Sequence, residues 1–138
     1  MKKLLGVCAL LLLLAACGDF QWFPDANPNV DMTPDQFSFT NQSCGVSVNT
    51  NVVSNSVTIT GINSPTTISV TGGEYSIDNG TFTTASGTIT NGQSVRVQPP
   101  GGQITTANSG PIVVTLNVGG VTASFTASTD PCVTGTTP

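Results

Sequence analysis

The feature that most constrains the fold lies near the carboxyl end, in residues 112–127, which read IVVTLNVGGVTASFTA. Apolar residues occupy every second position on each side of a glycine pair: Ile112, Val114, Leu116, Val118, Val121, Ala123, Phe125 and Ala127. A period of two places these side chains on one face of a β-strand. Gly119 and Gly120 tolerate the positive φ angles of a type I′ turn, whose twist matches the strands it joins. The stretch therefore predicts a β-hairpin.

The same alternation recurs in shorter segments between residue 36 and this hairpin. It is found in residues 56–60 (SVTIT), 68–70 (ISV), 75–77 (YSI) and 95–97 (VRV), and the last of these places Arg96 on the solvent face. Asp78-Asn79-Gly80 and Asn91-Gly92 are typical of tight turns. No helical period is found, so we expect seven to nine strands in about 100 residues, arranged as two antiparallel sheets packed face to face.

These segments resemble an immunoglobulin-like β-sandwich module that recurs in bacterial surface and exported proteins. The resemblance rests on QFSFT, SVTITGI, GGEYSI, NGQSVRV and VGGVTASF, and it covers nearly all of residues 36–127. It implies an all-β fold, an immunoglobulin-like antiparallel β-sandwich over residues 35–133, with a disordered tail over 134–138. Such modules act as spacers, adhesive units or appendages and share no catalytic residues, so the resemblance implies a fold more than a function. The chain departs from their usual context because it stands alone on a lipid anchor and carries a cysteine pair.

The amino terminus has the pattern of an export signal. Two lysines precede an apolar run, Leu4–Leu14, and two alanines follow it. The 13 residues from Leu4 to Ala16 are too few for a membrane-spanning helix, which needs roughly 20. Leu14-Ala15-Ala16-Cys17 resembles the lipobox of bacterial lipoproteins, which implies removal of a signal peptide, residues 1–16, and acyl chains such as palmitate on Cys17. The alternative is an ordinary secretory signal with a chance cysteine at its cleavage site.

Lipidation predicts a place in the cell envelope. Two or more acyl chains give a stable membrane anchor, where one chain is marginal. Gly18 stands where an enterobacterial lipoprotein retained in the inner membrane usually has Asp, which favours the outer membrane. Asp19 weakens this argument because sorting rules differ among bacteria, and nothing indicates which leaflet carries the lipid.

Residues 17–34 contain three prolines and no period of either kind, which predicts a flexible tether. As a coil, about 17 residues span roughly 20 to 25 Å. The aromatic residues Phe20, Trp22 and Phe23 either seat the anchor among lipid headgroups or pack back on the domain. Both alternatives stay open.

The tether also contains an echo of a calcium-binding loop. Residues 25–31 read DANPNVD, like the start of an EF-hand loop, but Val30 replaces its glycine and Gln36 its bidentate glutamate. A weak calcium site and a solvated linker are the two alternatives, and we expect the linker, with no metal bound.

Charge and cysteine content limit the function further. Both lysines lie in the leader, so the mature chain has one arginine against seven acidic residues, a net charge of −6. A nucleic-acid partner is excluded because binding to phosphates needs Lys and Arg. Cys8 leaves with the leader and Cys17 takes lipid, so Cys44 and Cys132 remain, and an exported chain usually oxidises such a pair. We expect this disulfide rather than a redox-active pair, because CxxC spacing is absent.

Catalytic chemistry has little basis in the sequence. There is no histidine, which removes Ser-His and Cys-His pairs and histidine metal sites. Glu74 and Asp78 lie on one strand face, four residues apart, and we expect both to be solvent-exposed. We therefore expect no enzyme, no catalytic residue, no cofactor and no small-molecule substrate.

The remaining prediction is an interaction module. Residues 36–40 and 121–126 contain no charge and no proline, so either could dock a protein or filament partner by strand addition if it lies at an exposed sheet edge. The alternatives are a non-catalytic subunit of a surface enzyme or of a secretion or filament system, and a weak polysaccharide binder. The scarcity of exposed aromatic residues counts against the last of these.

Overall fold

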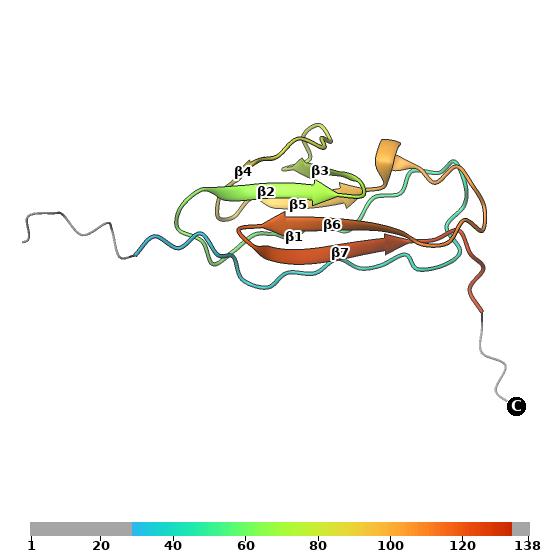
Figure 1. Cartoon of the computed structure of the whole chain (residues 1–138), viewed down its shortest axis with the longest axis horizontal. Helices are drawn as coiled ribbons and strands as arrows, with labels where there is room; N and C mark the ends of the chain where they lie inside the picture. The colour runs from blue at the N-terminus through green and yellow to red at the C-terminus, as the bar shows by residue number, and fades with distance from the viewer. Residues whose placement is uncertain (1–28, 134–138) are drawn as a thin grey trace, which may run out of the picture.

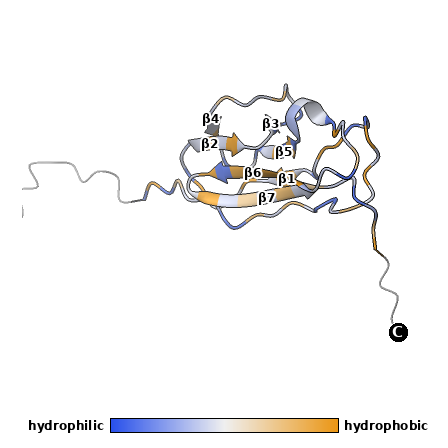
Figure 2. Cartoon of the chain, turned by 45° about the vertical axis from the view of Figure 1, so that its right-hand side comes forward, coloured by the Kyte–Doolittle hydropathy of each residue, from blue (hydrophilic) through white to orange (hydrophobic). Residues whose placement is uncertain are grey.

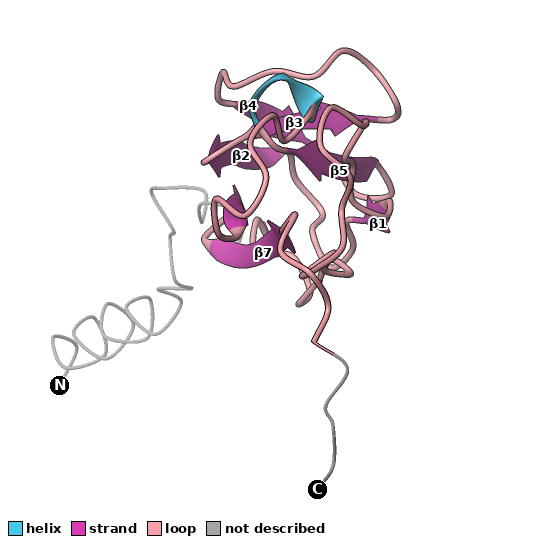
Figure 3. Cartoon of the chain, turned by 90° about the vertical axis from the view of Figure 1, so that its right-hand side faces the viewer, coloured by secondary structure: helices cyan, strands magenta, loops and turns pink. Residues whose placement is uncertain are grey.

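The computed structural model describes residues 29–133. The expected signal peptide, the lipid-attachment residue Cys17, most of the expected tether and the tail 134–138 lie outside the described residues. Within them the regular secondary structure is β-strand apart from one short 3₁₀ turn, η1 (Pro100–Gly102), and long loops connect the strands (Figure 3). No helix in this part of the chain has the length and apolar character that crossing a membrane requires.

Seven strands follow one another along residues 29–133. They are β1 (Val57–Thr58), β2 (Thr66–Thr71), β3 (Glu74–Ile77), β4 (Gly87–Ile89), β5 (Ser94–Gln98), β6 (Ile112–Val118) and β7 (Val121–Ala127).

The strands form two antiparallel sheets (Figure 1). One sheet has the order β4-β2-β6-β7 and the other the order β1-β5-β3. Side chains from both sheets fill the space between them, among them Ile68 and Phe125 from the first and Val95 and Val97 from the second, each 0% exposed. This agrees with the all-β, two-sheet sandwich that the sequence predicts.

The hairpin predicted from residues 112–127 is confirmed. β6 and β7 pair from Ile112 with Ala127 to Val118 with Val121, and Gly119 and Gly120 between them have φ angles of 55° and 91°. The other two predicted turns are also present. Asp78 and Asn79 have φ angles of 49° and 60°, and Gly92 has φ 85°. The turn chemistry visible in the sequence therefore sets the strand connections.

Alternation places apolar side chains in the core as expected. Arg96 projects to solvent between the buried Val95 and Val97. Figure 2, coloured by hydropathy, shows both hydrophobic and hydrophilic residues along β6. Phe37, Phe39, Tyr75 and Phe125 are buried, which leaves Phe82 half-buried and accessible.

The segment predicted at residues 56–60 forms a strand over only two residues, β1. Before it, the pairing with β5 is interrupted at Ser54: its N–H donates to the Val97 carbonyl at 2.9 Å, but the Val97 N–H donates to the Ser54 Oγ at 3.0 Å. A side-chain oxygen thus accepts the hydrogen bond that a backbone carbonyl would accept in a regular ladder. The ladder is interrupted here, but the Val97 N–H keeps a hydrogen-bond partner.

The opening segment, residues 35–46, connects the two sheets and is not a strand. The Asp35 N–H donates to the Thr60 carbonyl, which follows β1, whereas the Gln42 N–H donates to the Thr126 carbonyl of β7, both at 2.8 Å. Phe37 and Phe39 are buried with their rings edge to face at 6.2 Å. The segment closes one side of the sandwich.

The described chain enters and leaves at opposite ends of the domain (Figure 1). At the entry end, the Asp31 N–H donates to the Asn63 side-chain oxygen at 2.8 Å, and the Asn63 N–H donates to the Asp31 carbonyl at 3.0 Å. The last residues of the expected tether are therefore fastened to the domain.

Candidate functional site

The first candidate site is the free edge of β7, the last strand in its sheet. Val118 and Val121 flank a two-residue turn and form a hydrogen-bonded pair. The backbone N–H and carbonyl groups of every second residue of β7, counted from Val121, therefore point toward β6. Those of Thr122, Ser124 and Thr126 point away from β6, along the edge. The Thr126 carbonyl and N–H both bond to the opening segment and not to β6, which agrees with this alternation.

The end of this edge near Ala127 is already occupied. The Thr126 carbonyl accepts the Gln42 N–H at 2.8 Å, and the Thr126 N–H donates to the Asn41 side-chain oxygen at 2.9 Å. The Ser128 N–H in turn donates to the Gln42 carbonyl at 2.9 Å. Thr126, in the segment 121–126 predicted as a docking edge, is therefore covered by the chain itself.

The other half of the edge is open. No described residue forms a backbone hydrogen bond with Thr122 or Ser124 at this edge, and both residues are exposed. The opening segment runs to the Thr60 side here, so it does not extend the sheet. Of the two segments predicted as docking edges, residues 121–126 lie at a sheet edge and residues 36–40 do not form a strand.

The disulfide predicted between Cys44 and Cys132 is present, with a Cα–Cα distance of 5.0 Å and a sequence separation of 88. It lies at the end of the domain where the chain leaves. Backbone pairing holds the two segments together beside it, since the Gly45 N–H donates to the Asp130 carbonyl at 2.7 Å. The lipid-attachment residue Cys17 lies outside the described residues.

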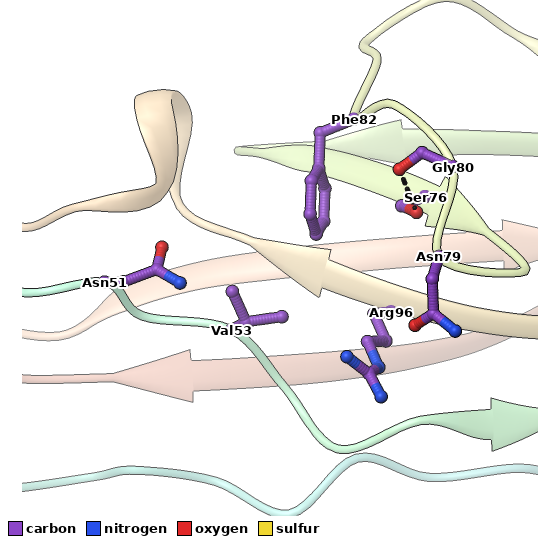
Figure 4. Close-up of a pocket in the computed structure, with 7 residues that line it drawn as sticks. All are labelled: Asn51, Val53, Ser76, Asn79, Gly80, Phe82 and Arg96. Atoms are coloured by element: carbon purple, nitrogen blue, oxygen red, sulfur yellow. Dashed lines mark hydrogen bonds between the residues drawn. The ribbon is translucent and has the colours of Figure 1, made fainter.

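A second candidate site is a pocket of about 260 Å³ on the outer face of the β1-β5-β3 sheet (Figure 4). Three separate segments line it: Asn51 and Val53 before β1, Arg96 of β5, and the stretch from Ser76 to Phe82. Arg96 pairs across the sheet with Ser76. Their side chains point to the same face.

The wall of this pocket is held in place by Ser76. Alternation along β3 would expose Ser76, yet it is only 2% exposed because the chain folds back over it after the turn at Asp78 and Asn79. The Ser76 hydroxyl donates to the Gly80 carbonyl at 2.8 Å. Backbone hydrogen bonds between Tyr75 and Thr83 fix the returning chain, so Phe82 projects into the pocket (Figure 4).

Two carboxylates lie in the chain on either side of Ser76, and neither forms an ion pair with Arg96. The expected shared strand face is not found, because Glu74 begins β3 but Asp78 lies in the turn after it. Glu74 accepts a hydrogen bond from the Gln98 amide at 2.6 Å and is half-buried, which differs from the expected full exposure. Asp78 is exposed as expected, and it accepts bonds from the Ser94 N–H at 2.8 Å and the Gln93 amide at 2.9 Å. These bonds lower the pKa of Asp78, the Ser94 N–H contributing most.

Only part of the stretch that resembles an EF-hand loop lies within the described residues. Asp31 is within the described chain, and its side-chain oxygen accepts the Thr33 N–H at 2.9 Å. Residues 29–133 contain no group of three or more His, Cys, Asp and Glu side chains that could hold a metal ion.

No protein family model matches this chain, and neither does any curated protein or solved structure. The site residues must therefore be interpreted from their own geometry. Sequence reasoning identified the β7 edge and the disulfide, but it missed the pocket. The available signals were the lone arginine, Arg96, and Phe82, which within residues 29–133 is the one aromatic residue outside the buried set.

Proposed function

We propose that this chain is a non-catalytic, lipid-anchored protein of the bacterial cell envelope, held in the outer membrane by acyl chains on Cys17, and that it binds a protein or filament partner by strand addition. The observation that carries the proposal is the open half of the β7 edge, at Thr122 and Ser124. We also infer that its sandwich is of the immunoglobulin-like type. The sequence resemblance supports this, together with an opening segment that pairs with the last strand.

The open edge has the chemistry that strand addition needs. Thr122 and Ser124 each present one N–H and one carbonyl, and residues 121–127 contain no charge, proline or bulge that would block an incoming strand. The pairing of Gln42 with Thr126 stops short of these groups. An added strand would continue the sheet from the place where the chain's own segment leaves it.

The expected affinity of one such contact is low. Four backbone hydrogen bonds at about 1 kcal/mol each give about 4 kcal/mol, which corresponds to a Kd near 1 mM. Side-chain contacts, or many copies displayed on one membrane, would raise this by avidity. The open half lies at the end where the chain enters from its tether, so a partner held near the same membrane is favoured (Figure 1).

Lysine substitution at the edge tests the proposal. Thr122→Lys combined with Ser124→Lys places charge along the open half, where it should abolish capture of the partner from the envelope fraction while the melting temperature stays the same. Thr88→Lys is the matched control, because Thr88 is an exposed threonine in β4, the strand at the other edge of the same sheet. Capture that survives the double substitution, or that is lost equally with Thr88→Lys, would contradict binding at β7.

A further inference from the structure

The pocket around Arg96 combines three kinds of group that point into one space (Figure 4). Arg96 supplies a planar guanidinium with five N–H donors, and no described residue forms an ion pair with it. Asn51 and Asn79 supply amides that each carry donors and an acceptor, and neither amide is used in a hydrogen bond within the described chain. Phe82 and Val53 supply apolar surface.

This combination matches a hydroxyl-rich ring. A sugar ring has a face of C–H bonds that packs on the electron-rich face of an aromatic ring, and neighbouring hydroxyls that both donate and accept. Flat amide and guanidinium groups present their hydrogen-bonding atoms in fixed pairs, which suits two adjacent hydroxyls. A purely apolar ligand would leave the three polar side chains without partners.

Local charge distinguishes a neutral sugar from an acidic one. Glu74 begins β3, two residues before Ser76 on the same strand face, and Asp78 lies in the turn that follows β3, two residues after Ser76. Neither carboxylate forms an ion pair with Arg96, because Glu74 accepts a hydrogen bond from Gln98 and Asp78 accepts bonds from Gln93 and Ser94. An anionic sugar would lose its hydration and meet one guanidinium with two acidic residues close to it in the chain. A neutral sugar has no charge to desolvate, so it does not incur this cost.

The size of the pocket sets the length of the ligand. Pockets that take whole drug-sized molecules measure about 300 to 1,000 Å³. At about 260 Å³ this pocket accommodates one small ring. Because it is open to solvent, a longer glycan would continue beyond it.

We propose that this pocket binds a single neutral sugar unit of a glycan, with Phe82 against the ring and Arg96, Asn51 and Asn79 bonded to its hydroxyls. The site lies on the β1-β5-β3 sheet, away from the β7 edge, so it is independent of strand addition. It would give the domain a second means of attachment within the envelope.

Saturation-transfer NMR on the mature, lipidated chain in detergent micelles tests the assignment. The probes are glucose, galactose, mannose and N-acetylglucosamine, with glucuronate as the charged analogue. We expect at least one neutral sugar to receive saturation, most strongly at the C–H protons of one ring face, and glucuronate to receive less. A single sugar bound by a few hydrogen bonds should show a Kd of about 1 mM.

Variants then locate the signal. Asn79→Gly removes an amide while retaining the left-handed backbone at φ 60°, and Arg96→Gln removes the guanidinium from an exposed position. Each should weaken binding about fivefold or more. Asn108→Gly is the matched control, since Asn108 is an exposed asparagine with φ 52° that does not line the pocket, and it should bind normally.

Three results would overturn the proposal: no saturation of any neutral sugar, stronger saturation of glucuronate than of glucose, or unchanged binding by both Asn79→Gly and Arg96→Gln. Thr122→Lys with Ser124→Lys should leave the sugar signal intact. Failure of strand addition and failure of sugar binding are thereby separated.

Discussion

Removal of the Cys44–Cys132 disulfide should weaken the domain chiefly by freeing the unfolded chain. We consider Cys44→Ala combined with Cys132→Ala, so that no lone thiol remains. The two cysteines are separated by 88 residues, and the bridge closes a loop around most of the domain. In the chain-entropy model, a loop of this length is worth about 4.6 kcal/mol at 25 °C.

The folded state should change little when the bridge is absent. The segments on either side of it are paired by backbone hydrogen bonds, from Gln42 to Thr126 and from Gly45 to Asp130, and both cysteines are exposed. No core side chain is removed. The full effect on the unfolded state should therefore appear in the measured free energy of unfolding. A domain whose free energy of unfolding is about 5 to 15 kcal/mol would lose about a third or more of this value.

Urea unfolding of a leaderless, soluble form with Cys17→Ser measures the effect. We expect the double variant to lose about 4 to 5 kcal/mol, with a larger m value because its unfolded chain exposes more surface. A thermal midpoint lower by roughly 15 °C or more should accompany the loss, at about 4 °C per kcal/mol for a domain near 100 residues. The parent protein reduced with a thiol is the control and should behave like the variant.

A loss below about 1 kcal/mol with an unchanged m value would refute this reasoning, because it would show that the bridge does not restrict the unfolded chain. A large loss in the variant with none in the reduced parent would assign the effect to the alanines.

Two further predictions concern charge and anchoring. Hydrogen bonds from Ser94 and Gln93 lower the pKa of Asp78, so its carboxylate stabilises the fold above its ordinary pKa of about 3.9, and this contribution is lost as the pH falls through the lower folded value. Asp78→Asn should flatten the acid loss of stability in urea midpoints taken at neutral and acidic pH, and parallel curves for parent and variant would contradict the role of Asp78. Cys17→Ala should abolish both incorporation of labelled palmitate and partition into detergent. Recovery of the wild-type protein in the aqueous phase with a free amino terminus would disprove lipidation.

Strand connections and the disulfide were predictable because their signals are local or follow from elimination. Gly119-Gly120, Asp78-Asn79 and Gly92 adopt the positive φ angles that their turn types require, and these residue types tolerate such angles. Cys44 and Cys132 remained after the leader and the lipid site had each accounted for one cysteine. Lipidation itself remains a prediction, as Cys17 lies outside the described residues.

The limits of strands that meet distant partners were not predictable from alternation. Residues 56–60 alternate well, yet β1 has two residues, and before it the Ser54 hydroxyl, not a backbone carbonyl, accepts the Val97 N–H. Residues 36–40 also have a strand-like pattern, but this segment passes from the Thr60 side to β7 and buries Phe37 and Phe39 on the way. In both cases the backbone pairing depends on which distant segment of the chain lies beside these residues in the folded structure.

The sequence by itself determined that this chain forms antiparallel strands joined by tight turns, because periodicity and turn conformation are properties of neighbouring residues. Only the tertiary structure decided which half of the β7 edge stays open, since Gln42 lies more than 80 positions before Thr126, with which it pairs. It also decided that Arg96, Asn51 and Phe82 share one pocket. Such sites arise where separate segments pack against each other, and alternation indicates which face a side chain takes but not which residues it meets there.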